Sequence, residues 1–418
     1  MKILIIGSGG REHAIIWKIF SQNNNTKIFS FPGNGGISEL SEIVNIPLNQ
    51  KKQIVEFVKK EKIGITIVGP EVPLSEGIVD IFIENGCPIF GPVQKAALIE
   101  SSKTWAKEFM SSSGIPTGSF DIFDNFNGAK NFLETKAHLP LVIKFDGLAA
   151  GKGVQITHTI KEGISFLDDI FLKNIYKTEN PKIIFEEFLT GKEISYLVFT
   201  DGQDFIPMEP AKDYKKIFDG DKGPNTGGMG CYSPVDFCTR DIKKSIEKQI
   251  IIPTLNNLQK RDILYTGVLY CGLILTSNGL KVLEYNARFG DPETEVILPG
   301  IKTPLIDIID AVINKELKKI KIQWDQNYYV DVVLSSQGYP DHYQTGKQIL
   351  GLDNIPSDIF VFHAGTKKQD NKYYTSGGRV LNIVSMGQNL IEAREKVYKA
   401  INQIEFEGKY YRKDIALS

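Results

Sequence analysis

The chain has few cysteines, no long apolar run and no surplus of charge of either sign. Its four cysteines in 418 residues form no C-x-x-C pair, which argues against a disulfide framework and predicts reduced, buried thiols. The apolar run at residues 3–6 is too short for a secretory signal, and no run approaches the ~20 residues of a membrane span. We therefore expect a cytoplasmic protein without membrane contact.

The charge balance excludes a further class. The chain carries 49 basic and 50 acidic residues, a formal net charge of −1, whereas a general nucleic-acid binder needs a basic surplus to neutralise phosphates. Hydrophobic residues make up 42% of the chain and charged residues 24%, which is typical of globular proteins and not of disordered ones. The length predicts two to four domains.

The sequence is richest in information where its glycines cluster. There are 38 glycines, against about 29 at average usage. In the first hundred residues, strands and helices are predicted to alternate, and each strand ends in a Gly/Pro loop. Ligands of open parallel sheets bind at this edge. The strands are expected at 2–6, 27–31, 63–68 and 88–90, with helices at 11–21 and 50–61.

The pattern changes at about residue 103. A helix is predicted at 103–113, strands at 141–145, 154–157 and 183–188, and a strand at 194–200 antiparallel to the last of these. A long polar loop without regular structure is expected from about 212 to 234, and a hairpin at 270–276 and 281–285 turns at Ser277-Asn278-Gly279. Short strands at 329–335, 359–362 and 379–385 and a helix at 389–404 indicate a small α+β domain.

The first glycine cluster, at residues 7–10, joins a strand to a helix, where backbone N–H groups can hold an anion. A dinucleotide fingerprint would need glycine in place of Glu12 and an acidic residue in place of Ser30-Phe31. A nicotinamide dehydrogenase is therefore disfavoured. A phosphate-bearing small molecule or a glycine turn that merely packs the helix is favoured.

The second cluster, residues 144–153, resembles a P-loop but is one residue short between Gly147 and Gly151. It also has Gly153 in place of the Ser/Thr, and a strand follows it. A glycine loop between strands can cover nucleotide phosphates, with Lys144 and Lys152 to neutralise them. The alternative is that these lysines are merely solvated.

Two sets of polar residues on predicted strands complete the pattern. Glu284, Asn286 and Arg288 share one face of an extended strand. The first two offer the oxygen ligands that Mg²⁺ prefers, and Arg288 would meet a phosphoryl group or an anionic intermediate. The alternative is a polar strand edge. Glu186 and Glu187 face opposite sides of their strand, and a carboxylate there can accept hydrogen bonds from ribose hydroxyls. The glycines at 223–230 would let backbone amides approach a substrate closely.

Ten motifs occur in an order that resembles a known family. They are GSGGREHA (7–14), PGN (32–34), TIVGPE (66–71), KFDGLAAGKGV (144–154), EEFL (186–189), GPNTGGMG (223–230), EYNARFGDPE (284–293), FHAGT (362–366), GGRVL (377–381) and YRKDIA (411–416). Together they resemble the phosphoribosylamine–glycine ligases, also called glycinamide ribonucleotide synthetases, of the ATP-grasp superfamily. The resemblance spans essentially the whole chain.

The resemblance implies an α/β fold of three parts. These are an N-terminal parallel-sheet substrate-binding (pre-ATP-grasp) domain at 1–102, an ATP-grasp domain at 103–314 with a mobile lid at about 119–190, and a small α+β C-terminal domain at 315–418. It implies that ATP, glycine and 5-phosphoribosylamine give glycinamide ribonucleotide, ADP and phosphate through glycyl phosphate, in de novo purine synthesis. A monomer or homodimer is expected. The alternatives are another ATP-grasp carboxylate–amine ligase of purine synthesis or a non-catalytic ATP-binding module.

The resemblance also implies roles for individual residues. The metal, Mg²⁺ or Mn²⁺, would be held by Glu284 and Asn286, and the catalytic residues would be Arg288, Lys215 and Asp213. ATP would be bound by Lys103, Lys144, Gly151, Lys152, Gly153, Glu186, Glu187, Leu189 and Glu193. Phosphoribosylamine would be bound by Gly9, Gly10, Asn34, Thr226, Gly227, Gly228, Asp291 and Arg379. Where the family usually has His, this chain has Tyr214, whose ordinary pKa of about 10 does not suit proton transfer near neutrality.

Overall fold

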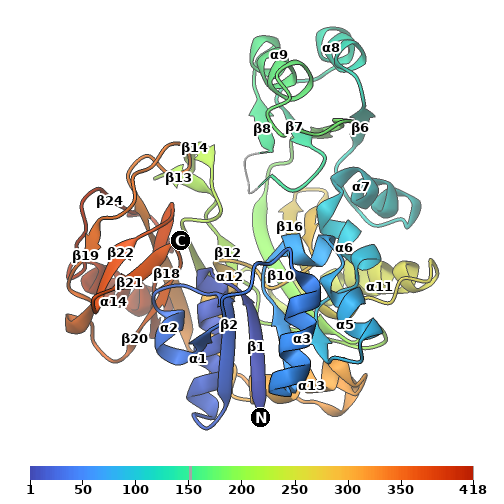
Figure 1. Ribbon diagram of the computed structural model, residues 1–418. Coiled ribbons are helices and arrows are strands. Elements are labelled where there is room, and N and C mark those ends of the chain that lie inside the picture. Colours follow the sequence, from blue (N-terminus) through green and yellow to red (C-terminus); the bar gives the residue numbers. More distant parts are fainter. Residues whose placement is uncertain (150–152, 418) are drawn as a thin grey trace.

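The computed structural model describes residues 1–149 and 153–417. Figure 1 shows a parallel sheet at the bottom, a small sheet with two helices rising at the top, and the C-terminal strands at the left. The four cysteines are buried free thiols. Within the described ranges, no helix combines the length and the apolar character needed to cross a membrane.

The N-terminal residues form a parallel five-stranded sheet in the order β3-β2-β1-β4-β5. The central strands β1 and β4 are apolar and buried on both faces, as expected for a parallel sheet that helices cover. This confirms the predicted α/β architecture. The strands are β1 (Lys2–Gly7), β2 (Lys27–Pro32), β3 (Glu42–Ile43), β4 (Ile65–Val68) and β5 (Ile89–Phe90), and the helices are α1 (Gly10–Gln22), α2 (Ile37–Leu40), α3 (Lys51–Glu61), α4 (Glu71–Ser75), α5 (Ile78–Glu84) and α6 (Gln94–Ser101).

A second, antiparallel sheet with the order β6-β9-β7-β8 makes the raised part in Figure 1. It encloses a core of its own, in which Leu133, Ile143 and Phe185 are buried, so this lid is a separately packed unit. Its strands are β6 (Phe120–Phe123), β7 (Leu141–Phe145), β8 (Val154–Thr157) and β9 (Ile183–Glu187), and its helices are α8 (Phe126–Thr135) and α9 (Ile160–Leu167), the latter continued by a π-helical turn, Asp168–Leu172.

A third sheet, β11-β10-β16-β17, lies beneath the lid. The predicted hairpin is confirmed, because β16 and β17 pair antiparallel. The predicted pairing of 194–200 with 183–188 is wrong: β10 pairs with β11 and β16. The chain leaves the lid sheet after β9 and enters this one at β10. Between them, Gly191 passes too close to the carbonyl of Leu275 to leave room for a Cβ. The strands are β10 (Lys192–Thr200), β11 (Phe205–Pro207), β16 (Gly267–Thr276) and β17 (Gly279–Asn286), with helices α7 (Lys103–Ser112), α10 (Arg240–Ile246), α11 (Ile252–Gln259), α12 (Glu293–Ile297) and α13 (Leu305–Ile313).

The C-terminal sheet has the order β12-β15-β18-β23-β20, and β24 also pairs with β18. Two of its strands come from residues 212–234. The expectation of a structureless loop there is therefore wrong. That segment holds β12 (Lys212–Asp213), β13 (Lys216–Phe218), β14 (Lys222–Asn225) and β15 (Gly230–Ser233). The remaining elements are β18 (Tyr328–Ser336), β19 (Gln348–Ile349), β20 (Ile359–His363), β21 (Thr366–Gln369), β22 (Lys372–Thr375), β23 (Arg379–Gly387), α14 (Leu390–Ile401) and β24 (Lys409–Tyr410).

Candidate functional site

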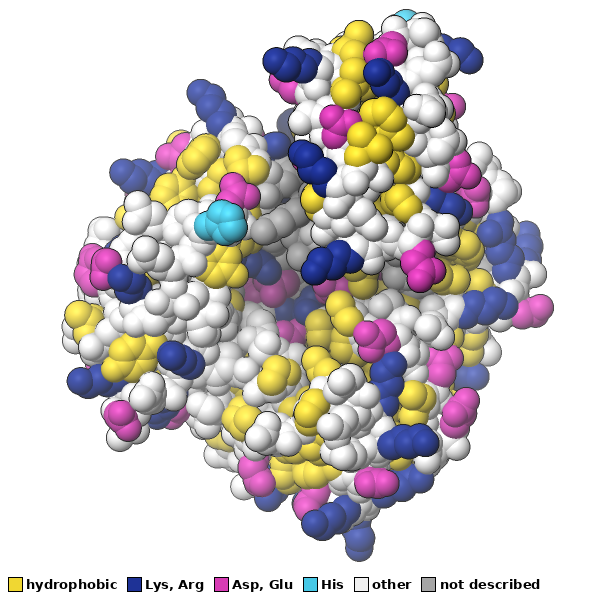
Figure 2. All heavy atoms as spheres, turned by 45° about the horizontal axis from the view of Figure 1, so that its top comes forward, with side chains coloured by type: hydrophobic (Ala, Val, Ile, Leu, Met, Phe, Trp, Pro, Cys, Tyr) yellow, Lys and Arg dark blue, Asp and Glu magenta, His cyan; other side chains and the backbone are white. Residues whose placement is uncertain are grey.

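Charged side chains gather where the three regions face one another. Figure 2 shows a hollow below the lid, with basic and acidic side chains at its floor. Two groups of predicted residues line this region. One lies beneath the lid around Lys144 and Glu284. The other surrounds a cavity between the N-terminal and C-terminal sheets.

The lid group is built on a buried carboxylate that lies between two lysines. Oε1 of Glu186 lies 3.0 Å from Nζ of Lys144, and Oε2 lies 2.8 Å from Nζ of Lys107. Burial lowers the pKa of Lys107 to about 8, although Glu186 beside it favours the charged form. Lys144 also donates to the carbonyl of Leu283, 3.1 Å away on β17. These contacts connect the lid sheet to the sheet below it.

Lys107 was missed by the sequence analysis, although a signal for it exists. It follows Lys103 by four residues on α7, so both lysines leave the same helix face. Nζ of Lys103 donates to the carbonyl of Gly147 at 2.6 Å, at the start of the second glycine cluster. Burial lowers the pKa of Lys103. The helix thus delivers two amines to the base of the lid, one on the half-buried Lys103 and one on the buried Lys107.

The other predicted nucleotide residues are spread around this group. Glu187 faces away from Glu186 and pairs with Lys281 at 3.1 Å, as the alternation predicts. Leu189 is half-buried, and Glu193 is exposed on β10. The carbonyl of Gly153 accepts a bond from the amide of Phe145 at 2.7 Å. The predicted residues Gly151 and Lys152 lie outside the described residues.

The predicted metal ligands lie at the end of β17. Oε1 of Glu284 is 3.0 Å from Nζ of Lys215, and this amine lowers the pKa of Glu284 to about 2. Oδ1 of Asn286 accepts from Nη2 of Arg288 at 3.2 Å. Two oxygen donors, one of them ionised, suit a hard cation that completes its shell with phosphate oxygens and water. Across the described part of the chain no group of three or more His, Cys, Asp or Glu could hold a metal.

Arg288 is held by two carboxylates that the sequence analysis did not select. Its Nε lies 3.3 Å from Glu71 and its Nη2 lies 3.0 Å from Glu100. Burial alone would lower the pKa of Arg288, but the two carboxylates raise it. The guanidinium is therefore fixed in direction and always charged.

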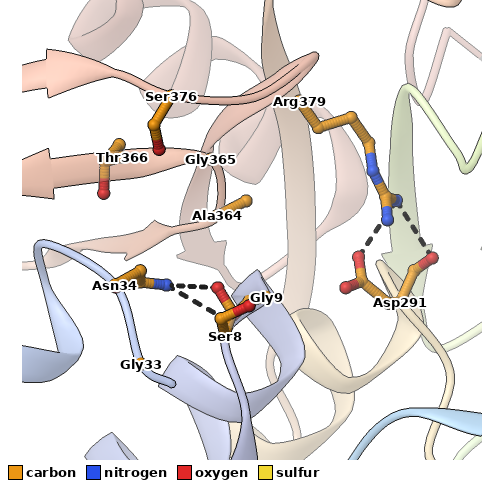
Figure 3. Close-up of a pocket in the computed structure, with 10 residues that line it drawn as sticks. All are labelled: Ser8, Gly9, Gly33, Asn34, Asp291, Ala364, Gly365, Thr366, Ser376 and Arg379. Carbon is orange, nitrogen blue, oxygen red and sulfur yellow. Dashed lines mark hydrogen bonds and ion pairs between the residues drawn. The ribbon is translucent and has the colours of Figure 1, made fainter. Parts of the chain in front are cut away.

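The second group surrounds a cavity of about 320 Å³. Figure 3 shows the side chains of Asn34, Thr366, Ser376 and Arg379 around it. Nη1 of Arg379 lies 3.0 Å from Oδ1 of Asp291 and donates to the carbonyl of Gly227 at 2.5 Å. The lining is Ser8, Gly9, Gly33, Asn34, Asp291, Ala364, Gly365, Thr366, Ser376 and Arg379.

Asn34 makes the floor of this cavity through its amide. Its Nδ2 donates to the carbonyls of Ser8 at 2.9 Å and His363 at 2.6 Å, and its Oδ1 accepts from the amides of Gly36 and Ile37. The amide thus joins loops from the N-terminal and C-terminal sheets. Asn34 lines the cavity, and its polar atoms are already engaged by the protein.

A buried histidine pair supports the same floor and was not predicted. Nδ1 of His13 accepts from the amide of His363 at 2.8 Å. Burial lowers the pKa of both rings, that of His363 to about 4, so both are neutral near pH 7. Neutral imidazoles here act as hydrogen-bonding groups.

The two predicted glycines of the first cluster differ in position. Gly9 lines the cavity, and its amide donates to Oε2 of Glu12 at 2.5 Å. Gly10 lies behind the cavity, where it packs against Glu295 and Asn382. Gly10 is therefore a close-packing position, and its expected place at the substrate stays a prediction. The absence of a side chain at Gly10 leaves room for the side chains of Glu295 and Asn382.

The segment 213–228 connects the two groups. Lys215 contacts Glu284, and Oδ1 of Asp213 faces Gly228. A Cβ on Gly228 would lie only 2.9 Å from this oxygen, and φ of Gly228 is +113°. Burial raises the pKa of Asp213 well above its usual value. Thr226 accepts from the amide of Gly228 at 3.0 Å. The predicted catalytic and substrate residues of this segment are thus brought together.

Comparison with known proteins identifies the family. Models of phosphoribosylglycinamide synthetase match residues 1–100 (N domain), 101–294 (ATP-grasp domain) and 329–418 (C domain). The chain belongs to the phosphoribosylglycinamide synthetase family. This confirms the resemblance and the ATP-grasp fold.

Similar members of the phosphoribosylglycinamide synthetase family match the full length of the chain. A phosphoribosylamine–glycine ligase of Caldanaerobacter subterraneus is 48% identical over 416 residues, which cover 100% of this chain and 99% of that one. The crystal structure of phosphoribosylamine–glycine ligase from Thermotoga maritima superposes with a TM-score of 0.85 at 35% identity, covering 99% of this chain and 100% of that one.

A likeness in fold extends beyond the phosphoribosylglycinamide synthetases. The biotin carboxylase domain of 2-oxoglutarate carboxylase from Hydrogenobacter thermophilus, solved with MgADP, ADP and bicarbonate, has a TM-score of 0.74 at 16% identity. The match covers 98% of this chain and 91% of that one.

Proposed function

We propose that this protein joins glycine to 5-phosphoribosylamine at the expense of ATP, giving glycinamide ribonucleotide, ADP and phosphate. The step belongs to de novo purine synthesis in the cytoplasm. Family membership supports the proposal, as does the name of a relative that is 48% identical over the full length. The observation that carries it is the contact of Lys215 with Glu284 at 3.0 Å, because it brings the oxygen donors of β17 to the segment that borders the Arg379 cavity.

ATP would lie between the lid and the sheet beneath it. Lys103 and Lys144 offer two amines from different elements, and Lys152 would add a third, to neutralise phosphate oxygens. The backbone and side chains at Glu186, Glu187, Leu189 and Glu193 would border the nucleoside, and the glycine loop with Gly151 and Gly153 would cover the phosphates. The buried ion pairs of Glu186 hold Lys107 and Lys144 in place before the nucleotide arrives.

Glu284 and Asn286 would hold Mg²⁺ or Mn²⁺ with the phosphates. A bound divalent cation neutralises charge on the transferring phosphoryl group. Glu284 fits this role because Lys215 keeps it ionised. The same lysine lies 3.0 Å from the carboxylate that the cation would meet.

The reaction needs no nucleophile from the protein. The glycine carboxylate would attack the γ-phosphorus to form glycyl phosphate, and the amine of phosphoribosylamine would then attack the acyl carbon and release phosphate. Arg288, fixed by Glu71 and Glu100, would stabilise the negative charge that develops. Asp213 and Lys215 would orient the reactants from the segment between the two groups. Catalysis would thus consist of positioning and charge stabilisation.

Phosphoribosylamine would occupy the cavity between the N-terminal and C-terminal sheets. Arg379 and the backbone at Gly9 would face its phosphate, while Asp291 and the Thr226–Gly228 turn would border its ribose and amine. Arg379 is suited to phosphate because its guanidinium presents several donors in a plane. Asn34 would act through the loops that its amide ties together.

An omission series tests this function. We expect phosphate release from ATP that requires glycine, 5-phosphoribosylamine and a divalent cation together. Release that ignores glycine would refute the ligase. Dependence on a different carboxylic acid or amine would instead identify another carboxylate–amine ligase, and nucleotide binding without any turnover would identify a non-catalytic module.

A further inference from the structure

Tyr214 lies between two residues that we assign to the reaction, yet its side chain leaves the opposite face of the strand. The backbone around it is extended and paired: its amide donates to the carbonyl of Gly230 at 3.0 Å, and that of Thr226 donates to Lys215 at 2.8 Å. Successive side chains of an extended segment alternate. Asp213 and Lys215 therefore face the site, and Tyr214 faces the C-terminal residues.

The group that covers Tyr214 is the guanidinium of Arg412. Its Cζ lies 5.0 Å from the centre of the Tyr214 ring, within reach of a cation–π interaction. The Tyr214 hydroxyl accepts a hydrogen bond from the amide of Ala416 at 3.1 Å. Burial raises the pKa of Tyr214 to about 12, so the hydroxyl is neutral across the working range of pH.

Arg412 is wholly buried, and its side chain donates hydrogen bonds both to the C-terminal residues and to the β13–β14 hairpin. Its Nε and Nη2 donate to the two carboxylate oxygens of Asp414 at 2.7 and 2.6 Å. Its Nη1 donates to Oδ1 of Asp221 at 2.8 Å and to the carbonyl of Lys216 at 3.0 Å. One guanidinium therefore fastens the chain end to the β13–β14 hairpin.

Further contacts secure the turn and the strands of the same hairpin. The amide of Gly220 donates to Asp414 at 2.7 Å, and the amide of Lys413 donates to Asp219 at 2.9 Å. The hydroxyl of Tyr410 donates to the carbonyl of Ile217 at 2.9 Å. The hairpin is thus held along its length by residues 410–416.

This hairpin runs directly into the turn that borders the cavity. β14 ends at Asn225, and the next residues are Thr226 and Gly227. The carbonyl of Gly227 accepts from Arg379. Movement of the hairpin would consequently shift Lys215, which directly precedes its first strand, and the turn that follows its second strand.

We propose that Arg412 and Tyr214 are positioning residues, which hold the segment that carries Asp213 and Lys215, between β12 and β13, and the Thr226–Gly228 turn in their working geometry. The inference rests on the proposed function for its kinetic consequence. A buried charge is a poor device for stability alone, because apolar residues of similar volume do as well or better. What Arg412 adds is a planar fork of donors that fixes several acceptors in direction at once.

Arg412→Lys tests the proposal, because it keeps the charge and removes the planar fork. We expect kcat/KM for phosphoribosylamine to fall by about tenfold or more, since small misplacements of reacting groups have effects of this size. The dissociation constant for ADP, measured without added metal, should change by less than about twofold, because Lys103, Lys144 and Glu186 lie on other elements. Arg261→Lys is the control, since Arg261 also lies over a ring, that of Phe109 at 4.8 Å, but is exposed and lies outside the hairpin.

A second pair of variants covers the case in which Arg412→Lys does not fold. Tyr214→Leu removes both the ring and the hydroxyl and should reproduce the loss in kcat/KM, whereas Tyr214→Phe keeps the ring and should recover most of it. A folded Arg412→Lys or Tyr214→Leu protein with unchanged kcat/KM would overturn the proposal. A loss of ADP affinity as large as the loss of kcat/KM would do so too.

Different measurements test the positioning role of Arg412 and the proposed function. If the wild-type protein shows no glycine-dependent turnover, the proposed function fails, and hydrogen exchange of residues 216–228 then decides about Arg412. Faster exchange in the variant than in the wild type would support the positioning role. Equal exchange would overturn it.

Discussion

Nζ of Lys215 lies 3.0 Å from Oε1 of Glu284, and this contact joins the segment between β12 and β13 to the end of β17. Burial works against the charge of Lys215, but Glu284, Glu193 and Asp213 outweigh it and raise its pKa. Lys215 in turn keeps Glu284 ionised. The pair therefore presents a charged carboxylate and a charged amine to the same space.

Glu284→Gln should abolish most of the turnover while the protein stays folded. The amide keeps the size of the side chain but removes the charge that we assign to metal binding, and we expect a loss of roughly 100-fold or more in kcat. The measurement is turnover titrated with Mg²⁺. Glu209→Gln is a closely matched control, because Glu209 pairs with Lys243 at 2.8 Å with the same exposure. Equal losses in both variants would make Glu284 a structural residue.

Lys107→Met should destabilise the protein. It leaves Glu186 buried with Lys144 as its remaining lysine partner, and removing one member of a buried ion pair typically costs on the order of 3 kcal/mol. Thermal melting checks the loss. The double variant Lys107→Met with Glu186→Gln should recover part of the stability, because it removes the unbalanced carboxylate. If Lys107→Met melts at the same temperature as the wild type, the Lys107–Glu186 ion pair does not contribute to stability.

Asn34→Ala should weaken the use of phosphoribosylamine and leave that of ATP unchanged. The substitution frees the carbonyls of Ser8 and His363 and lets the floor of the cavity move, for which we expect about a tenfold rise in KM for phosphoribosylamine. Steady-state kinetics with each substrate varied in turn would measure it. Asn257→Ala, at a helix position remote from the cavity, is the control. A rise in KM for ATP of the same size would argue against a local effect.

The histidine pair makes stability depend on pH. The folded-state pKa of His363 is about 4, below the unfolded value of about 6.5. Between these values the unfolded chain binds a proton that the folded protein does not, so stability falls as pH drops from 6.5 toward 4. At pH 5 the loss is about 2 kcal/mol. Melting temperatures at pH 7.5 and 5 should therefore fall further for the wild type than for His363→Asn. Equal falls would refute this account.

Much of the fold can be predicted from local patterns. Apolar runs that end in Gly/Pro loops mark β1, β2 and β4, because parallel strands buried on both faces need no alternation. The β9–β10 pairing is predicted wrongly because adjacency in sequence favours a hairpin. At Gly191 the chain instead passes into another sheet. The strands within 212–234 are two to four residues long. Among them, β15 pairs with β18, about a hundred residues later, which no local pattern reveals.

The parts of the candidate site that lie in sequence motifs can be predicted, whereas the contacts that arise from tertiary packing cannot. Glu284 and Arg379 lie in motifs that indicate their roles, and Lys107 is recoverable from its spacing to Lys103. His13 and Arg412 also lie in motifs, but the motifs do not reveal their contacts. The partners of Arg412, Asp221 and Lys216, lie almost two hundred residues earlier.

The central claim is that ATP is used to activate the carboxyl group of glycine for attack by an amine. Glycine labelled with ¹⁸O in its carboxylate tests this directly, with mass analysis of the released phosphate. If the carboxylate attacks the γ-phosphorus and the amine then displaces phosphate from the acyl carbon, each phosphate carries one ¹⁸O atom from glycine. Phosphate without ¹⁸O would mean that water or another nucleophile takes the phosphoryl group, and would contradict the account.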